Sequence, residues 1–359
     1  MYYNNLEITG FRGIKHLKID GFGDINLLVG KNNSCKTTVL EALFLLTGIS
    51  NAALVETINR FRDLISESNE DFSFIFHNLD FESKLVLKAF LNNNKFKREL
   101  SIIPSYIKEN GKKIDEAKFK QLQSYETSIQ KKVINELLFN FSIFEKNKNN
   151  YQSKLGFKDR ELIAFPTQNY KEKLFGFYIT PKYSISHDIH QTLEDIIVNK
   201  KKDEIINILQ LIEPNIKDIS FGLNRMIFVD IGVDKLLPLN LQGSGTIKLL
   251  QIILALYKVK DGIIFIDELE NGFHFSTLKD IWKIIIETSK KNNIQVFVTS
   301  HNLDTLKFLK SAIEENEDKS SKNRVRSITL RRLPDDSIKS YVYNFEQFEF
   351  SLEQGIEIR

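Results

Sequence analysis

The sequence is poor in cysteine, carries little net charge and has no long apolar run. Cys35 is the only cysteine among 359 residues, which excludes an intrachain disulfide framework and favours a reducing compartment. No stretch approaches the roughly 18 uninterrupted apolar residues that a helix needs to cross a bilayer. Residues 1–10 do not combine a basic stretch with an apolar core, as a secretory signal would. We therefore predict a cytoplasmic protein without a membrane partner.

The charge of the chain is close to balance, because 50 basic residues face 47 acidic ones and leave a formal charge of +3. Proteins that coat nucleic acid carry a larger basic excess. Any DNA binding is therefore expected to be weak, salt-dependent and confined to a local patch. The patch that the sequence offers is the group Lys112, Lys113, Lys118 and Lys120. A solvated face that binds nothing is the more frequent meaning of such lysine-rich segments.

The length is more than one hydrophobic core usually holds, so we expect two domains or one domain with a large insertion. We divide the chain into an N-terminal lobe over residues 1–55, an insertion over 56–235 and a C-terminal lobe over 236–359. In the insertion, alternation over 72–91 predicts antiparallel strands. Further along, five apolar residues predict a helix that is too short for a coiled coil. They are Ile129, Val133, Leu137, Leu138 and Phe141.

Strands and helices alternate in the two outer lobes, which favours a parallel sheet covered by helices. In the first lobe, apolar runs predict exposed strands at 6–8 and 17–19, a buried strand at 25–29 and a helix over 37–48. The expected elements of the last lobe are helix 246–259, strand 262–266, helix 277–290, strand 294–299, a hairpin of 328–333 with 338–342, and helix 345–353. The predicted fold class is therefore α/β.

Residues 30–37, between the buried strand and its helix, read Gly-Lys-Asn-Asn-Ser-Cys-Lys-Thr. A strand, a glycine loop and a helix form the context of a phosphate-binding loop, in which backbone N–H groups and the helix N-terminus attract phosphate. Lys36 would reach the β and γ phosphates of ATP, and the Thr37 hydroxyl would bind Mg²⁺. An Asn-rich turn that merely caps the helix is the alternative. The predicted loop contacts are Gly30, Lys31, Asn32, Asn33, Ser34, Cys35, Lys36, Thr37 and Thr38.

Two acids, Asp267 and Glu268, follow the apolar strand predicted over 262–266. A buried strand of a parallel sheet delivers the residues at its carboxyl end to the ligand-binding edge. Asp267 can hold Mg²⁺ there, while Glu268 points the opposite way and can orient or deprotonate the attacking water. Alone, the pair could simply cap the next helix. Downstream of a phosphate loop, it indicates hydrolysis of ATP.

Two further segments place polar residues at the ends of predicted elements. His301 follows the strand over 294–299 and can hydrogen-bond the γ-phosphate or the attacking water, or else the backbone of the next helix. Ser244 and Gly245 stand in a glycine-flanked turn that opens a helix and offers free N–H groups to an anion. We therefore predict Glu268 and His301 as catalytic residues and Ser244 and Gly245 as additional ATP contacts.

Together with the Phe-Arg-Gly triplet at 11–13, these motifs resemble the ABC-like ATPases of the SMC, RecF and OLD group. They are most similar to the compact AAA-type ATP-binding proteins of bacterial phage-defence systems. The resemblance implies a P-loop NTPase of ABC type, with a mainly parallel sheet, an antiparallel N-terminal β lobe and a partly helical insertion. It also implies that Ser244 and Gly245 form the signature motif and His301 the switch histidine. ATP would lie between the Walker A loop of one subunit and the signature motif of another, in a dimer or larger homo-oligomer.

The sequence departs from that family pattern at Cys35, where the usual second glycine is missing, and at Phe275, where many members have proline. No glutamine is assigned to the Q-loop. Cys35 has two interpretations. At a helix N-terminus beside Lys36, its thiol pKa would be lowered, and the thiolate would react readily unless ATP protected it. Alternatively, the side chain packs as a small hydrophobe under a loop whose backbone does not need positive φ.

Three functions stay open on the sequence alone. The first is an ATP-driven switch whose closed dimer is read by DNA or by a separate effector protein, in phage defence. The second is a repair or recombination ATPase that acts on DNA directly. The third is a module that binds ATP without hydrolysing it, with Cys35 as a mark of decay. A built-in metal-dependent nuclease is not expected, because the about 58 residues after His301 lack an acidic strand-end cluster.

Overall fold

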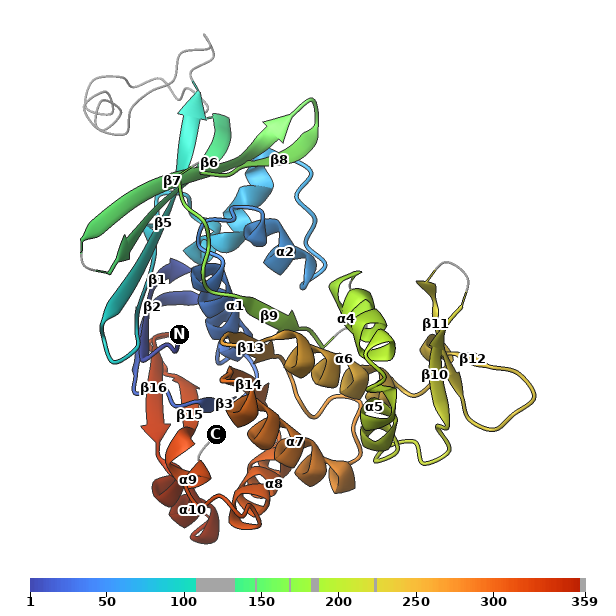
Figure 1. Cartoon of the computed structure of the whole chain (residues 1–359). Helices are drawn as coiled ribbons and strands as arrows, with labels where there is room; N and C mark the ends of the chain where they lie inside the picture. Colours follow the sequence, from blue (N-terminus) through green and yellow to red (C-terminus); the bar gives the residue numbers. More distant parts are fainter. Residues whose placement is uncertain (108–132, 146, 168, 182–186, 223–224, 356–359) are drawn as a thin grey trace, which may run out of the picture.

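The computed structural model describes residues 1–107, 133–145, 147–167, 169–181, 187–222 and 225–355. In these residues the strands form three sheets, of seven, six and three strands (Figure 1). The six-stranded sheet lies at the centre of the view, the seven-stranded sheet above it and the three-stranded sheet to the right.

The six-stranded sheet is parallel except for one edge strand, β16 (Ile338–Tyr343). Its order is β16, β15 (Val325–Arg332), β3 (Ile25–Val29), β14 (Gln295–Ser300), β13 (Ile263–Ile266) and β9 (Gly176–Ile179). Strand β16 pairs with β15 in the antiparallel sense. The carboxyl ends of β3, β13 and β14 therefore meet at one edge of the sheet, where a parallel sheet presents its ligand site.

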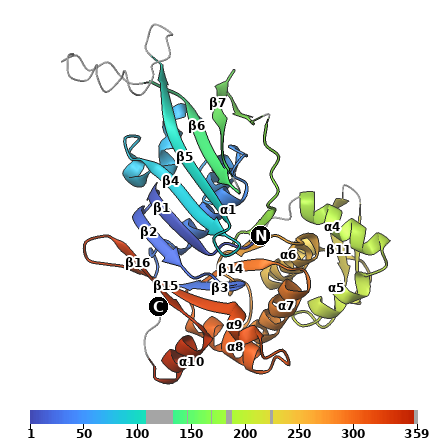
Figure 2. The same cartoon turned by 60° about the vertical axis from the view of Figure 1, so that its left-hand side comes forward.

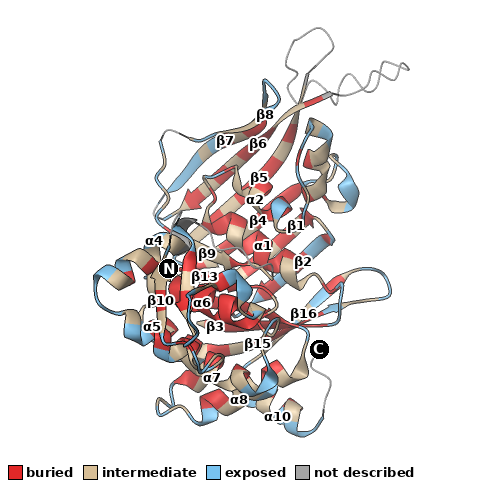
Figure 3. Cartoon of the chain, turned by 90° about the vertical axis from the view of Figure 1, so that its right-hand side faces the viewer, coloured by how far each residue is buried: buried red, intermediate tan, exposed pale blue. Residues whose placement is uncertain are grey.

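Both faces of this sheet are covered, which is why its central strands β3, β13 and β14 are mostly apolar and fully buried. Residues Ile25, Leu27 and Val29 of β3 point into one core, and Leu28 points into the other. The first core is closed by α6 (Ser244–Lys258), α7 (Leu278–Lys291) and α8 (Leu303–Glu314). The second is closed by α1 (Lys36–Thr47), on which the seven-stranded sheet rests. Figure 3 shows buried residues concentrated in these central strands and helices.

The seven-stranded sheet is antiparallel. Its order is β2 (Ile14–Asp20), β1 (Asn5–Phe11), β4 (Leu85–Leu91), β5 (Phe96–Ile107), β6 (Val133–Phe144), β7 (Lys148–Lys158) and β8 (Glu161–Phe165). The expected combination of a mainly parallel sheet with an antiparallel lobe is confirmed, although most strands of the lobe come from the middle of the chain. At its edge, β2 lies beside β16, where the Ser340 hydroxyl donates to the Lys18 carbonyl over 2.7 Å (Figure 2).

Two predictions for the middle of the chain are wrong. The residues Val133, Leu137, Leu138 and Phe141 belong to strand β6, not to a helix. The helical spacing was incidental, because the buried residues 137, 139, 141 and 143 recur at every second position. Of the alternation over 72–91, only β4 is a strand, because residues 69–75 and 77–79 form 3₁₀ helices. Residue Ile129 and the four lysines at 112, 113, 118 and 120 lie outside the described residues.

A small unit beside the six-stranded sheet packs on α6 through two helices, α4 (His187–Val198) and α5 (Lys202–Leu209), that precede α6 in the chain (Figure 1). It consists of these helices and the strands β10 (Asp218–Phe221), β11 (Ile227–Asp230) and β12 (Leu237–Pro238). The remaining helices are α2 (Leu54–Arg60), α9 (Ser321–Arg324) and α10 (Phe345–Glu353). The domain boundaries at 55 and 235 stay a proposal. None of the helices in the described residues is long and apolar enough to cross a membrane.

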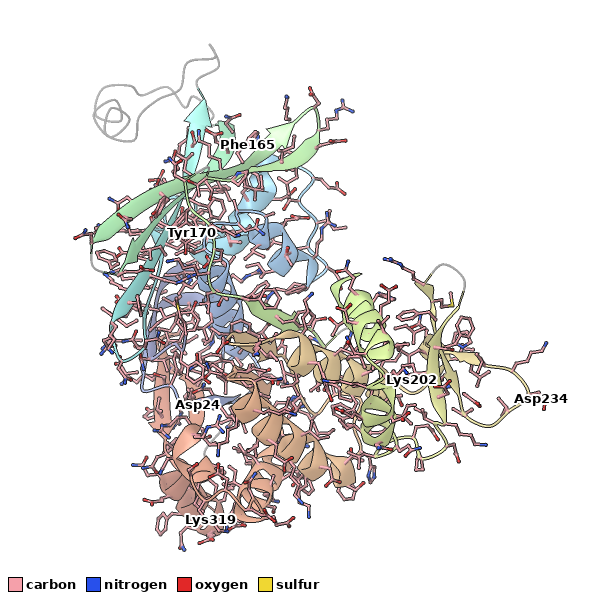
Figure 4. All side chains as sticks on the ribbon, viewed as in Figure 1. Asp24, Phe165, Tyr170, Lys202, Asp234 and Lys319 are labelled. Carbon is pink, nitrogen blue, oxygen red and sulfur yellow. The ribbon has the colours of Figure 1, made fainter. Side chains whose placement is uncertain are left out.

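One buried cluster joins the seven-stranded sheet to the six-stranded one. Arg98 of β5 donates to the Leu46 and Thr47 carbonyls at the end of α1, over 2.8 and 3.0 Å, and pairs with Glu172. Tyr170, labelled in Figure 4, packs on aromatic rings of β6 and β7. The connection from β8 to β9 is therefore fixed to the lobe and to α1 at the same point.

Candidate functional site

The loop between β3 and α1 has the tight backbone that residues 30–37 predict. Gly30 has φ 152°, and a β-carbon there would lie 2.4 Å from the Leu330 carbonyl oxygen, so only glycine fits. The Lys36 ammonium donates to the Gly30 and Lys31 carbonyls over 2.7 and 3.1 Å. Burial lowers the pKa of Lys36, while Glu268 and two other acids oppose the shift. The lysine therefore lies within the loop, at the N-terminus of α1.

A cavity of about 1050 Å³ opens on this loop. Its volume is at the upper end of what small-molecule sites have. The basic residues that line it outnumber the acidic ones by two, which favours an anion. The charged lining residues are Arg12, Lys36, Arg62, Arg332, Glu268 and Asp336. Of the loop residues named above, Asn32 to Thr38 line this cavity, and Lys31 lines a neighbouring hollow.

Asp267 and Thr37 come together although 230 positions separate them. The Thr37 hydroxyl donates to the Asp267 carboxylate over 3.0 Å, and the Thr299 hydroxyl donates to the same oxygen over 2.6 Å. Burial raises the pKa of Asp267, and the two hydroxyls oppose the shift. A buried carboxylate beside a hydroxyl is an oxygen donor set that fits Mg²⁺. Among the residues that the structure describes, no group of three or more His, Cys, Asp or Glu could hold a metal ion.

Glu268 adopts a left-handed backbone with φ 49°, which is unusual for a residue with a β-carbon. Its N–H donates to the Thr299 hydroxyl over 2.7 Å, and its carboxylate accepts from the Asn271 amide. Thr299, near the end of β14, thus bridges the two acids that follow β13. The carboxylate lies on the wall of the cavity, so it can reach a water molecule there.

Lys248 is fully buried in α6, four residues after Ser244. Its ammonium donates to the Glu268 carbonyl and lies 3.5 Å from the Asp267 carbonyl. Burial lowers the pKa of Lys248 to about 8, while Glu270, Asp267 and Glu268 oppose the shift. The lysine therefore connects the start of α6 to the backbone of the two acids.

Comparison with known proteins identifies the family of the chain. A family model described as "AAA domain, putative AbiEii toxin, Type IV TA system" matches residues 25–307, which is more than half of the chain. The chain belongs to this AAA-domain family. The match spans the phosphate loop, the start of α6, both acids and His301. Together with the fold, this match makes the chain a P-loop ATPase of the AAA type.

Two relatives and one solved structure are informative. A Helicobacter pylori protein named ATP/GTP phosphatase is 28% identical over 338 residues, covering 87% of this chain and 89% of that protein. The replication and repair protein RecF of Oenococcus oeni is 40% identical over 75 residues, or 21% of this chain and 19% of RecF. An SMC head bound to the C-winged helix domain of ScpA has a TM-score of 0.50 and 11% identity, covering 98% of this chain and 100% of that chain. The last likeness concerns the fold alone.

Three predicted site residues, Ser244, Gly245 and His301, do not line the cavity on the phosphate loop. Ser244 and Gly245 begin α6, and a β-carbon on Gly245 would lie 2.4 Å from the Gly272 carbonyl, so this helix start packs tightly against residues 270–273. His301 is held by Glu270, whose carboxylate lies 2.9 Å from Nδ1 and accepts from the backbone N–H over 2.8 Å. Neither segment lines the cavity.

Sequence reasoning missed a buried ion-pair group beneath the phosphate loop. Glu41 of α1 is fully buried, forms an ion pair with Arg12 over 3.0 Å and accepts hydrogen bonds from Arg62 over 2.7 and 3.0 Å. Burial lowers the pKa of Arg12 to about 10, with Glu41 opposing the shift, so the guanidinium stays charged near neutrality. Arg62 also donates to the Thr38 hydroxyl over 3.3 Å. A glutamate at the sixth position of an apolar helix was the available signal.

Neither sequence interpretation of Cys35 survives unchanged. Burial raises the pKa of its thiol, with Arg332 opposing the shift, so the reactive thiolate is not supported. The thiol does pack against the core, but the backbone has φ 65°, so this position does require positive φ.

We therefore expect Cys35 to react with maleimide more slowly at pH 7 than a free cysteine does, because little thiolate forms at a buried thiol. Mass spectrometry after a brief pulse measures the rate, and the denatured chain is the control that should label quickly. A native rate equal to that of N-acetylcysteine would contradict the burial described above.

Proposed function

We propose that the chain binds ATP with Mg²⁺ in the cavity on the phosphate loop and hydrolyses it. The observation that carries this proposal is the 3.0 Å contact between the Thr37 hydroxyl and the buried Asp267 carboxylate, beside Lys36 and below Glu268. The family match supports it, and so does the name of the Helicobacter pylori relative.

Each residue then has a defined task. The backbone N–H groups of the loop and the N-terminus of α1 hold the phosphates, and Lys36 exchanges its two carbonyl contacts for the β and γ phosphates. Thr37 and Asp267 would hold Mg²⁺, which supplies charge stabilisation for the phosphoryl group. Glu268 orients the attacking water and accepts its proton, from a position fixed by Thr299 and Lys248.

The proposal extends to self-association, with ATP at the contact between subunits. Ser244 and Gly245 open a 15-residue helix whose first N–H groups can bind phosphate, yet they do not line the cavity of their own chain. Apolar side chains beside them are open to solvent, since Leu241 is 72% and Phe275 59% exposed. A second copy placed over the cavity would cover these side chains and supply the missing phosphate contacts.

Self-association is tested with Glu268→Gln, which should trap ATP. With ATP and Mg²⁺, we expect this variant to sediment at a higher mass than it does without nucleotide, because bound ATP bridges two chains. Adding Ser244→Arg should abolish the shift, since the long side chain blocks the start of α6. Ser320→Arg, at an exposed position before α9, is the control. A single unchanged mass for Glu268→Gln, with and without ATP, would refute the bridging role.

For the biological role, we propose that the ATP-bound state is read by DNA or by a separate effector protein, in phage defence. The 75-residue match to RecF favours a DNA repair or recombination ATPase as the second candidate. The third possibility, a module that binds ATP without turnover, is tested by phosphate release from the purified protein. Steady release that requires Glu268 would exclude it.

A further inference from the structure

Arg332, the last residue of β15, extends from the β15–β16 hairpin to the phosphate loop. Its Nε donates to the Asn33 carbonyl over 3.0 Å, and one Nη donates to the Cys35 thiol over 3.4 Å. The other Nη pairs with Asp336, in the hairpin turn, over 2.5 Å. One guanidinium therefore contacts two loop residues while it is anchored to the turn.

The two loop residues share an unfavourable backbone. Asn33 has φ 64° and Cys35 φ 65°, in the left-handed region that a β-carbon disfavours. Asparagine visits this region more readily than other residues, whereas cysteine has no such tendency. The loop thus needs external contacts to stay in the conformation that a glycine at position 35 would adopt freely.

The turn between β1 and β2 also restrains the Cys35 thiol. A β-carbon on Gly13, in the turn between β1 and β2, would lie 3.0 Å from the Cys35 sulfur and 3.5 Å from an Arg332 nitrogen. The thiol is therefore held between the turn and the guanidinium. Arg332 also lines the cavity on one side of the loop and a hollow of about 530 Å³ on the other. A movement of the hairpin would act on both sides of the loop.

We propose that Arg332 is a positioning residue for the phosphate loop, which keeps Asn33 and Cys35 left-handed and so links the β15–β16 hairpin to nucleotide affinity. The inference rests on the proposed function, because it concerns the same ATP site. A partner that pulls Asp336 away from Arg332 would loosen the loop and release nucleotide. The rate at which bound ATP is hydrolysed would change little, because other contacts hold Glu268 and Asp267.

The test compares Arg332→Gln with Arg331→Gln, using fluorescence of a ribose-labelled ATP analogue for the dissociation constant and phosphate release for kcat. Both variants lose one positive charge at the end of β15, but Arg331 is exposed and lines only the hollow of about 530 Å³, whereas Arg332 also lines the cavity. We expect Arg332→Gln to raise the dissociation constant about tenfold, the usual effect of losing a charged hydrogen-bond donor, with kcat within about twofold. Arg331→Gln should leave both values near those of the parent.

The second arm repeats Arg332→Gln in a Cys35→Gly background. Since glycine holds positive φ without support, the loss should shrink to about threefold. Equal losses in both backgrounds, or equal effects of the two arginine variants, would overturn the positioning role. If Arg332→Gln does not fold, Arg332→Lys replaces it, because lysine keeps the charge but cannot make the several contacts of the guanidinium. An unchanged ATP affinity of Arg332→Lys would also overturn the positioning role. A parent protein that binds no ATP would instead refute the proposed function.

Discussion

Glu268→Gln should release phosphate at least about 100-fold more slowly than the parent protein, while it still binds ATP. The reason is that glutamine keeps the shape of the side chain on the cavity wall but cannot accept the proton of the attacking water. Phosphate release at saturating ATP measures the loss, and fluorescence of a labelled ATP analogue measures the binding that stays.

Lys36→Ala gives the contrasting result, because it removes the ammonium next to the phosphates. We expect ATP binding itself to be lost, so no ATP concentration restores turnover. Glu287→Gln, on an exposed position of α7, is the control for the loss of a carboxylate. Turnover of Glu268→Gln at the parent rate would show that another group serves as the base.

Lys248→Met should reduce turnover about tenfold or more and change ATP affinity little, because the Glu268 and Asp267 carbonyls lose their buried donor. Without that contact, the left-handed backbone at Glu268 is held less firmly, although it keeps the hydrogen bond from its N–H to the Thr299 hydroxyl. Methionine fills a similar volume, so the core around α6 should stay packed. The comparison variant is Lys258→Met, at the other end of the same helix.

The same variant tests the buried charge through the pH dependence of stability. The pKa of Lys248 is about 8 in the folded chain and 10.5 when unperturbed. Between these values the unfolded chain binds more protons, so stability should rise with pH in the parent relative to Lys248→Met. Chemical unfolding at pH 7.5 and pH 9.5 measures the difference. Parallel pH profiles of the two proteins would mean that the ammonium is not buried as described.

The parts of the fold that sequence could predict are those where one pattern excludes the others. Strands β3, β13 and β14 are short, mostly apolar runs followed by glycine, acids or polar residues, a pattern typical of a parallel strand that is covered on both faces. Strand β6 was misread because its long apolar run also contains pairs at helical spacing. Helix α8 was missed, although the Asn302 side chain caps it by accepting from the Asp304 N–H.

The candidate site was less predictable wherever a role depends on long-range packing. No local pattern predicts that Lys248, on a helix whose residues 245–256 are all buried, turns its ammonium toward the Asp267 and Glu268 carbonyls, because lysine normally points to solvent. Likewise, the contact between Arg332 and Cys35 joins residues 297 positions apart. The motifs on the loop and the acidic strand could be found because each is contiguous in sequence.

The position of β3 within its sheet also constrains how the chain can fold during synthesis. Both neighbours of this early strand, β14 and β15, begin after residue 294, whereas β1, β2 and β4 to β8 can pair once residue 165 has emerged. A ribosome-bound chain therefore carries the phosphate-loop residues long before the sheet that shapes them exists. Until then, the four apolar residues of β3 lack their final partners and are open to chaperones or to aggregation. Nucleotide can first assist folding only after β15, which ends at Arg332, has emerged from the ribosome.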